Sequence, residues 1–281
     1  MRAFRYVLAD VFTDVPLAGN QLAVFTDARD LDEPTMQALA LELGFSESVF
    51  VLPPRSGGHV RIRIFTPTSE LAFAGHPTLG AAFVLGAPLQ LGAIALETGA
   101  GTVPVRLERD ESGRIVFGRM VQPVPSVHPF AAGRELLAAL GVDRSELPLE
   151  LYDNGSEHVF VALRSEEEVA ALVPDFGALT QFGFVGANVF AGAGRRWKLR
   201  MFSAVEGLGE DAATGSAAGP LAAHLARHGR IAWGDEIVIS QGAEIGRPST
   251  LHALASGTGG EIEAVEVGGS AVVVARGEFR L

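Results

Sequence analysis

Two stretches of the chain, RIRIFTPTSELAFAGHPTLGAAFVL at Arg61–Leu85 and KLRMFSAVEGLGEDAATGSAAGPLAAHLARHG at Lys198–Gly229, follow the same pattern. Each starts as an alternating strand that ends in Phe, continues through a loop with an acidic residue, and reaches a Gly-polar pair that opens a helix rich in Ala and Leu. A similar string precedes each stretch, GFSESVF in the first case and GFVGANVF in the second. This shared order predicts an internally duplicated fold.

The two predicted helix starts, Gly75-His76-Pro77 and Gly215-Ser216-Ala217, are suited to binding an anion. The first N–H groups of a helix have no partner within the helix and lie at the positive end of its dipole, and glycine lets a ligand approach the backbone. One such start would be explained as an ordinary capped helix. Two related starts in one chain predict a site for a small, negatively charged ligand.

Composition narrows the classes of function. The chain has 281 residues, is 48% hydrophobic and carries a net charge of -11, which argues against nucleic acid as a partner. It contains no cysteine, so thiol nucleophiles, Cys-ligated metals and disulfides are excluded. The N-terminal residues do not resemble a signal peptide, and no apolar run is long enough to span a bilayer. We expect a cytoplasmic protein that does not bind membranes.

The pattern of short strands and few helices predicts an α+β fold. Strands are expected at Phe4–Phe12, Gln21–Phe25, Val49–Leu52, Val60–Phe65, Val103–Leu107, Ile115–Met120, His158–Leu163, Asn188–Ala191, Trp197–Phe202, Glu236–Ser240, Leu251–Ala255, Glu261–Val267 and Ala271–Ala275. Helices are expected at Pro34–Leu43, Pro77–Leu85, Arg134–Leu140 and Ser216–Arg227. The second and fourth of these helices are apolar nearly all round, which is typical of a helix buried inside a sheet.

These elements predict two similar domains, each a curved, largely antiparallel sheet or barrel around a central helix. Residues 1–120 with a C-terminal strand at about 270–281 are assigned to the first domain, and residues 121–269 to the second. The segment Val121–Pro125 (VQPVP) is the expected linker, because its prolines favour an extended spacer. The site is expected in the cleft between the domains.

Several polar side chains are candidates for chemistry. Glu47 lies just before the apolar run Val49-Phe50-Val51, and a carboxylate that loses hydration there is suited to exchanging protons near neutral pH. A solvent-exposed loop glutamate remains the alternative. Asp211 lies five residues before Ser216, with Glu70 as its expected counterpart six residues before His76. His76 is expected to be neutral at its helix start, either bonding a ligand or simply capping the helix.

Other named chemistries have little support in the sequence. Thr214 stands where a serine-hydrolase elbow needs Gly, no Gly-rich dinucleotide motif follows a strand, and no Walker A motif occurs. His224 and His228 are spaced to share one helix face and could hold a metal, but they lack an H-E-x-x-H arrangement. His228 lies beside Gly229 and is expected to complement the helix dipole instead. No metal and no cofactor are predicted.

Four strings, DVFTDVPLAGNQLAVF, GFSESVFV, FTPTSELAFAGHPTLGAA and GEDAATGSAAG, together resemble the PhzF-like family of phenazine biosynthesis, within the diaminopimelate-epimerase-like superfamily. They occur in the family's order over the whole chain. The resemblance implies two similar domains with the active site between them, a homodimer, and a cofactor-free isomerase that moves a proton on a ring carboxylate. Ala212 departs from the family's usual Pro.

The resemblance also assigns roles to individual residues. It implies that Glu47 moves the proton, and that His76 and Asp211 position polar groups of the substrate. It implies substrate binding at Gly75, Gly215, Ser216 and Asn20. Racemising relatives use two cysteines just before the helix starts, where this chain is expected to have Ala74 and Ala213.

Two alternatives stay open from the sequence. One is an epimerase or racemase that uses two carboxylates, Glu47 and Asp211, in place of two thiols. The other is a metabolite-binding protein that has the same fold and no reaction. The identity of the small carboxylate is not predicted.

Overall fold

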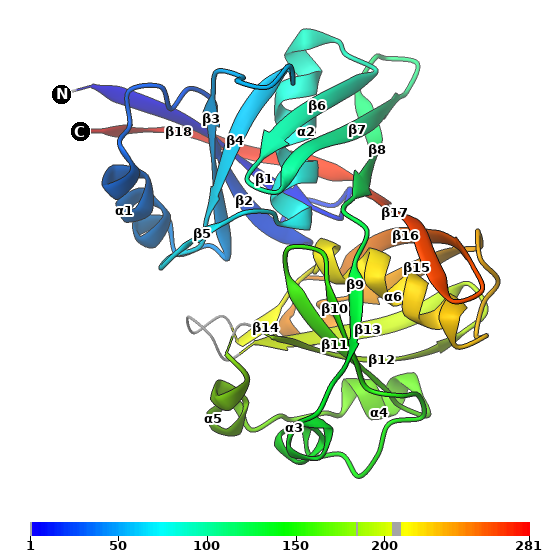
Figure 1. The fold of residues 1–281 in the computed structure, drawn as a ribbon. Helices are drawn as coiled ribbons and strands as arrows, with labels where there is room; N and C mark the ends of the chain where they lie inside the picture. Colours follow the sequence, from blue (N-terminus) through cyan, green and yellow to red (C-terminus); the bar gives the residue numbers. More distant parts are fainter. Residues whose placement is uncertain (1, 184, 204–208) are drawn as a thin grey trace. The chain divides into compact units, whose positions relative to one another are not determined.

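The computed structural model describes residues 2–183, 185–203 and 209–281. Phe184 and residues 204–208, which belong to the second duplicated copy, lie outside the described residues. The chain forms two compact units, Met1–Val121 with Gly268–Leu281 and Gln122–Val267. Each unit is described by itself below, and the labels are those of Figure 1.

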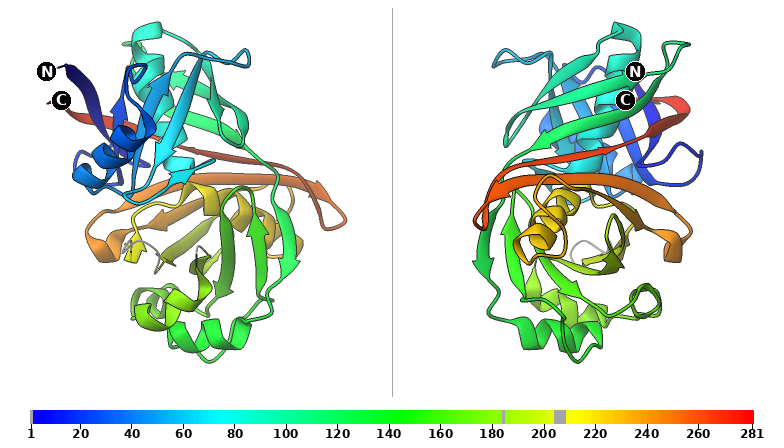
Figure 2. Two further views of the ribbon diagram at one scale, coloured as in Figure 1. Left: turned by 60° about the vertical axis from the view of Figure 1, so that its left-hand side comes forward. Right: turned by 90° about the vertical axis from the view of Figure 1, so that its right-hand side faces the viewer.

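The first unit is a mostly antiparallel sheet. Its strands are β1 (Ala3–Val11), β2 (Asn20–Phe25), β3 (Glu47–Leu52), β4 (Val60–Phe65), β5 (Glu70–Leu71), β6 (Ala93–Thr98), β7 (Gly101–Arg109), β8 (Ile115–Gln122) and β18 (Ala271–Arg280). Pairing runs in the order β18-β1-β2-β3-β4-β6-β7-β8, with β5 added to β4. The β2–β3 and β4–β6 pairs are parallel. Because β1 pairs with β18, the two chain termini lie side by side (Figures 1 and 2).

The second unit repeats this arrangement. Its strands are β9 (Ser126–Pro129), β10 (Glu150–Asp153), β11 (Glu157–Ala162), β12 (Gly186–Ala193), β13 (Arg196–Ser203), β14 (Gly209–Asp211), β15 (Glu236–Gln241), β16 (Ser249–Thr258) and β17 (Glu261–Gly269), the last of which runs into the first unit. Pairing runs β9-β10-β11-β12-β13-β15-β16, with β14 added to β13. The β11–β12 and β13–β15 pairs are the parallel ones, as in the first unit.

Strand register fixes which residues correspond between the two copies. Phe65 at the end of β4 pairs with Ser48, and Phe202 near the end of β13 pairs with Ala187. The residue before each partner is Glu47 in the first unit and Gly186 in the second. The second unit therefore has a glycine where the first has a glutamate.

The expected correspondence between Glu70 and Asp211 is wrong. Phe65 pairs with Glu70 on β5, whereas Phe202 pairs with Glu210 on β14. Glu70 therefore corresponds to Glu210, and Asp211 corresponds to Leu71. Glu70 and Glu210 each lie five residues before the glycine of their helix start, Gly75 and Gly215. The expectation failed because it matched Asp211 to the nearest acid, which lies one position farther from its helix start.

Each unit buries one long helix. The helix α2 (Gly75–Leu89) contacts β1, β2, β3, β6, β7 and β18, and lies behind β6 and β7 in Figure 1. The helix α6 (Gly215–Arg227) contacts β11, β15 and β16. Every residue of α6 from Gly215 to Ala226 is buried, which confirms the expectation from its composition. Gly80 of α2 is needed because an added Cβ would lie 2.5 Å from Leu22 Cδ2.

The remaining helices are short. They are α1 (Glu33–Leu43), α3 (Gly133–Leu140), α4 (Glu166–Ala170), α5 (Phe176–Leu179), and the 3₁₀ turns at Thr180–Phe182 and Ala243–Ile245. Asp32 caps α1 and Gly44 ends it in a left-handed conformation. The sequence did not predict β5, β6, β9, β10, β14, α4 or α5. None of the helices in the described part of the chain combines the length and the apolar character needed to cross a membrane.

A buried ion pair holds the strand that leads to α6. Arg200 of β13 donates from Nε and Nη2 to the carboxylate of Glu210 at 2.8 and 2.7 Å, and both side chains are 8% exposed. The Nη1 group of Arg200 also donates to the backbone oxygens of Val169, Ala170 and Leu172. In the first unit the corresponding pair, Arg63 and Glu70, is more exposed. The second unit therefore depends more on its ion pair.

We predict that Arg200→Met lowers the free energy of unfolding by about 3–5 kcal/mol, because it leaves the Glu210 carboxylate buried without its partner. The internal repeat supplies a matched control, Arg63→Met, which we expect to cost about 1 kcal/mol because Glu70 can rehydrate. Urea unfolding followed by circular dichroism measures both. Equal losses for the two variants would contradict this account of the ion pair.

Candidate active site

In the first unit the predicted residues Glu47, His76 and Asn20 come together at the start of α2. Glu47 is the first residue of β3, and its side chain is 14% exposed, so the solvent-exposed alternative is not what the structure has. Its Oε2 lies 3.3 Å from Nε2 of His76. The other ring nitrogen, Nδ1, lies 3.2 Å from Nδ2 of Asn20, and Ser46 Oγ donates to Asn20 Oδ1 at 3.1 Å.

The His76 ring is uncharged in this setting. The residue is 3% exposed, and burial lowers the pKa of His76 to about 3. A neutral imidazole donates from one nitrogen and accepts at the other. Nδ1 contacts the Asn20 amide, and Nε2 lies on the side of the ring that faces the carboxylate of Glu47. The neutral ring of His76 therefore lies next to this carboxylate without forming an ion pair with it.

In the second unit the predicted Ser216, at the start of α6, is contacted by a histidine that the sequence did not point to. His158 of β11 lies with Nε2 2.9 Å from Oγ of Ser216, and its Nδ1 lies 3.2 Å from Nδ2 of Asn188. Burial lowers the pKa of His158 to about 4, so this ring is also neutral near pH 7. Each helix start thus carries one uncharged histidine.

The first turn of α6 is held by a further side chain. Pro220 has no N–H and so cannot bond to the carbonyl of Ser216 four residues earlier. Nδ2 of Asn154 donates to that carbonyl at 2.9 Å instead, and Nε2 of Gln122 donates to the Gly215 carbonyl at 2.8 Å. These two amides fix the backbone at the Gly215-Ser216 pair.

Asp211 lies in the same unit as Ser216, at the end of β14, and is 7% exposed. Its Oδ2 accepts a hydrogen bond of 2.6 Å from Oγ1 of Thr214, the N-cap residue of α6. Gln241 joins this group, since its Nε2 donates to the Asp211 carbonyl and its Oε1 accepts from the Thr214 N–H. The hydroxyl of Thr214 therefore donates to Asp211 and does not cap α6.

The position of the N-caps corrects one expectation. The residue before α2 is Ala74 and the residue before α6 is Thr214, so Thr214, not Ala213, corresponds to Ala74. Neither residue caps its helix through a side chain. The amides of Gly75, His76, Gly215 and Ser216 are those that an α-helix leaves without internal partners. These helix starts retain the anion-binding character predicted for them.

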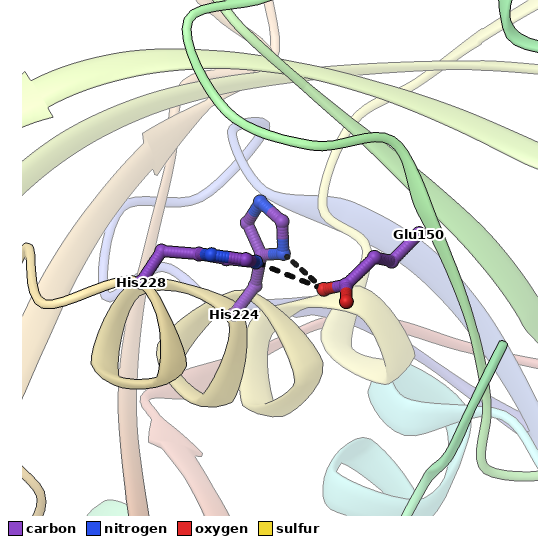
Figure 3. Close-up of side chains that lie close together, drawn as sticks. All are labelled: Glu150, His224 and His228. Carbon is purple, nitrogen blue, oxygen red and sulfur yellow. Dashed lines mark hydrogen bonds and ion pairs between the residues drawn. The ribbon is translucent and has the colours of Figure 1, made fainter. Parts of the chain in front are cut away.

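The two histidines near the end of α6 form a separate cluster with Glu150 of β10 (Figure 3). Oε2 of Glu150 lies 2.9 Å from Nε2 of His228 and 3.5 Å from Nδ1 of His224. Tyr152 donates its hydroxyl to the same oxygen at 3.0 Å, and Arg227 Nη2 lies 3.5 Å from the other oxygen. The pKa of Glu150 falls to about 2, chiefly through the contact with His224.

This donor set resembles a metal site, but its surroundings favour a hydrogen-bonded network. The guanidinium of Arg227 would repel a cation at the Glu150 carboxylate. A histidine that ligates a metal normally donates its other N–H, yet the buried Nε2 of His224 has no hydrogen-bond partner among the described residues. We therefore interpret the cluster as a hydrogen-bond network that joins α6 to β10 and stabilises the fold.

We predict that neither EDTA nor an equimolar addition of Zn²⁺ changes the melting temperature of the protein, because the Glu150 carboxylate already has its partners. A ligand that binds the folded state would raise that temperature. Differential scanning fluorimetry is sufficient, with His228→Gln as the control. A rise of several degrees with Zn²⁺ that is lost in His228→Gln would show a metal site.

We predict that stability declines as the pH falls below about 6.5, the ordinary pKa of a histidine in an unfolded chain. Burial lowers the pKa of His76 to about 3 and that of His158 to about 4, so the unfolded chain binds more protons than the folded protein between these limits. The free energy of unfolding then falls by about 1.4 kcal/mol per pH unit for each histidine. His158→Gln should flatten the decline measured by urea unfolding, while the exposed-site control His128→Gln should not. Equal slopes in all three proteins would contradict the assignment.

Comparisons with known proteins agree with this architecture. The model of the PhzC-PhzF family, described as phenazine biosynthesis-like protein, matches residues 9–277. The chain is 53% identical over 277 residues to a trans-2,3-dihydro-3-hydroxyanthranilate isomerase of Pseudomonas aeruginosa, covering 99% of each chain.

Two solved structures are also similar to this chain. One is a PhzF-family phenazine biosynthesis protein of Bacillus anthracis, with a TM-score of 0.86, 26% identity and 100% of each chain covered. The other is a predicted epimerase of Pseudomonas aeruginosa, with a TM-score of 0.82, 36% identity, and 98% of this chain and 99% of that chain covered. The chain therefore belongs to the PhzC-PhzF family of phenazine biosynthesis-like proteins and is a PhzF-like isomerase.

Proposed function

We propose that this isomerase acts on trans-2,3-dihydro-3-hydroxyanthranilate or a close ring carboxylate, in a cleft shared by two domains that correspond to the two units. The observation that carries the proposal is the contact between Glu47 and His76 at the start of α2, in a chain 53% identical to an isomerase of that name. The carboxylate is mostly buried and lies next to the neutral ring of His76, in reach of a substrate bound at this helix start.

The strand register supports different catalytic roles for the two units. Glu47 corresponds to Gly186 and Asp211 to Leu71, so each unit supplies one acid that the other lacks. We propose Glu47 as the proton-transferring residue, with His76 and Asp211 orienting the polar groups of the substrate. An isomerase needs this kind of asymmetry because the two ends of its proton transfer are different atoms.

The chemistry is a proton transfer within one molecule. Ionised Glu47 takes a proton from a C–H carbon next to the unsaturated ring system, which leaves a neutral glutamic acid and a delocalised anion. The same proton returns to a different carbon, and the double bonds move accordingly, so that the atoms and the charge of the substrate are unchanged. The amides of Gly75 and Gly215, the hydroxyl of Ser216 and the amide of Asn20 bind the substrate carboxylate and its polar groups.

A second candidate is an epimerase that uses two carboxylates. It is favoured by the position of Asp211 beside the start of α6, where its Oδ2 is held by Thr214. Turnover in heavy water separates the candidates, because an epimerase places deuterium in both stereoisomers at one carbon. An isomerase leaves the product with a shifted double bond.

We also propose a cytoplasmic homodimer, on the grounds of the family resemblance. The chain has no cysteine, which suits a reducing compartment. Sedimentation equilibrium of the purified protein tests the dimer directly, and a single species at the mass of one chain would refute it.

We predict that Glu47→Gln lowers kcat on trans-2,3-dihydro-3-hydroxyanthranilate by about 10²–10⁴-fold, because the amide cannot accept the proton. The matched control is Glu70→Gln, an acid in the same unit that pairs with Arg63. We expect that control to keep its activity. The turnover of both purified variants is measured spectrophotometrically. Full turnover by Glu47→Gln would contradict the catalytic role of Glu47.

A further inference from the structure

The second unit replaces the carboxylate of the first unit with a histidine. Gly186 corresponds to Glu47 in strand register, and a Cβ added to Gly186 would lie 2.8 Å from Nδ1 of His158. The ring of His158 therefore occupies the space that a side chain at position 186 would take. From there it reaches Ser216, the residue of α6 that corresponds to His76 of α2.

The direction of the hydrogen bonds around His158 is fixed by the backbone. Nδ2 of Asn188 lies 2.9 Å from the Gly186 carbonyl and 3.4 Å from the Val159 carbonyl, so this atom is the amide nitrogen. The same nitrogen lies 3.2 Å from Nδ1 of His158. Because it is a donor, Nδ1 must be the acceptor, and a neutral ring then carries its proton on Nε2.

The tautomer decides what Ser216 can do. Nε2 of His158 donates to Oγ of Ser216 at 2.9 Å, so the serine oxygen accepts this bond and its own proton is directed to another acceptor. We propose that His158 is a positioning residue, which holds Ser216 as a hydrogen-bond donor at the start of α6 and so selects an acceptor-only group, a carboxylate. This proposal rests on the proposed function, since it names the group of the substrate that this helix start binds.

The arrangement explains why the site would prefer an anion. The Gly215 and Ser216 amides and the Ser216 hydroxyl all present hydrogens, and His158 is 3% exposed and cannot turn toward solvent. A ligand group with a hydrogen of its own would meet donors on every side. His158 acts through Ser216 and is not itself expected to touch the substrate.

The first experiment is a double-mutant cycle with trans-2,3-dihydro-3-hydroxyanthranilate as the probe. His158→Leu and Ser216→Ala should each raise KM about tenfold, with kcat changed less than about threefold, because a bond to the bound carboxylate is lost. The double variant should have the same KM as Ser216→Ala alone. His158→Gln places an amide N–H near Nε2 and should restore KM to within about threefold of the wild type.

A purely structural role for His158 gives a different result. The KM increases caused by His158→Leu and Ser216→Ala would then multiply in the double variant. His158→Leu would lower the melting temperature whether or not Ser216 is present, and His158→Gln would give no recovery of KM. That outcome would overturn the proposal.

The second experiment needs neither substrate nor a destabilising variant. Histidine ¹⁵N chemical shifts distinguish the two neutral tautomers, and the His158 resonances are assigned by their loss in His158→Gln. We expect the proton on Nε2 near pH 7, and a proton on Nδ1 would overturn the inference. If the wild type does not turn over the probe, the proposed function fails, while the observed tautomer still decides the role of His158.

Discussion

The proposed site depends on a single constraint, which is the burial of two helix starts whose N-cap side chains do not cap them. The first N–H groups of α2 and α6 lie in a protein interior, and the N-cap residues Ala74 and Thr214 make no side-chain bond to them. An α-helix leaves its first amides without internal partners, and a buried amide that found no acceptor would cost free energy. A ligand carboxylate at these amides would supply the missing acceptor.

Duplication provided two equal helix starts, and substitution made them different. At the position next to the helix start, the first unit has Glu47 and the second has Gly186 with His158 filling the space. At the end of the following hairpin, the first unit has Leu71 and the second has Asp211. In the proposed function, the first unit supplies the base and the second supplies hydrogen-bond donors beside a second acid. This difference between related halves is what a directed proton transfer requires.

Much of the fold was accessible from the sequence because the motifs are local. The Gly-polar pairs at Gly75 and Gly215 located both buried helices, and the mixed fold with many strands and few helices is confirmed. The counterpart of Asp211 was missed because it was sought as an acid. Counting back from His76 and Ser216 matches Asp211 with Leu71, in agreement with the strand pairing. His158 was missed because its partner Ser216 is 58 positions away and comes from another element. The one available signal was a histidine directly before the apolar run Val159–Ala162.

The most direct test of this account is a crystal structure with 3-hydroxyanthranilate, an aromatic analogue without the proton that Glu47 would remove. We predict that its carboxylate accepts hydrogen bonds from the Gly215 and Ser216 amides and from the Ser216 hydroxyl, while its ring lies against the carboxylate of Glu47. A carboxylate bound away from both helix starts, or a Glu47 side chain turned away from the ring, would contradict the account.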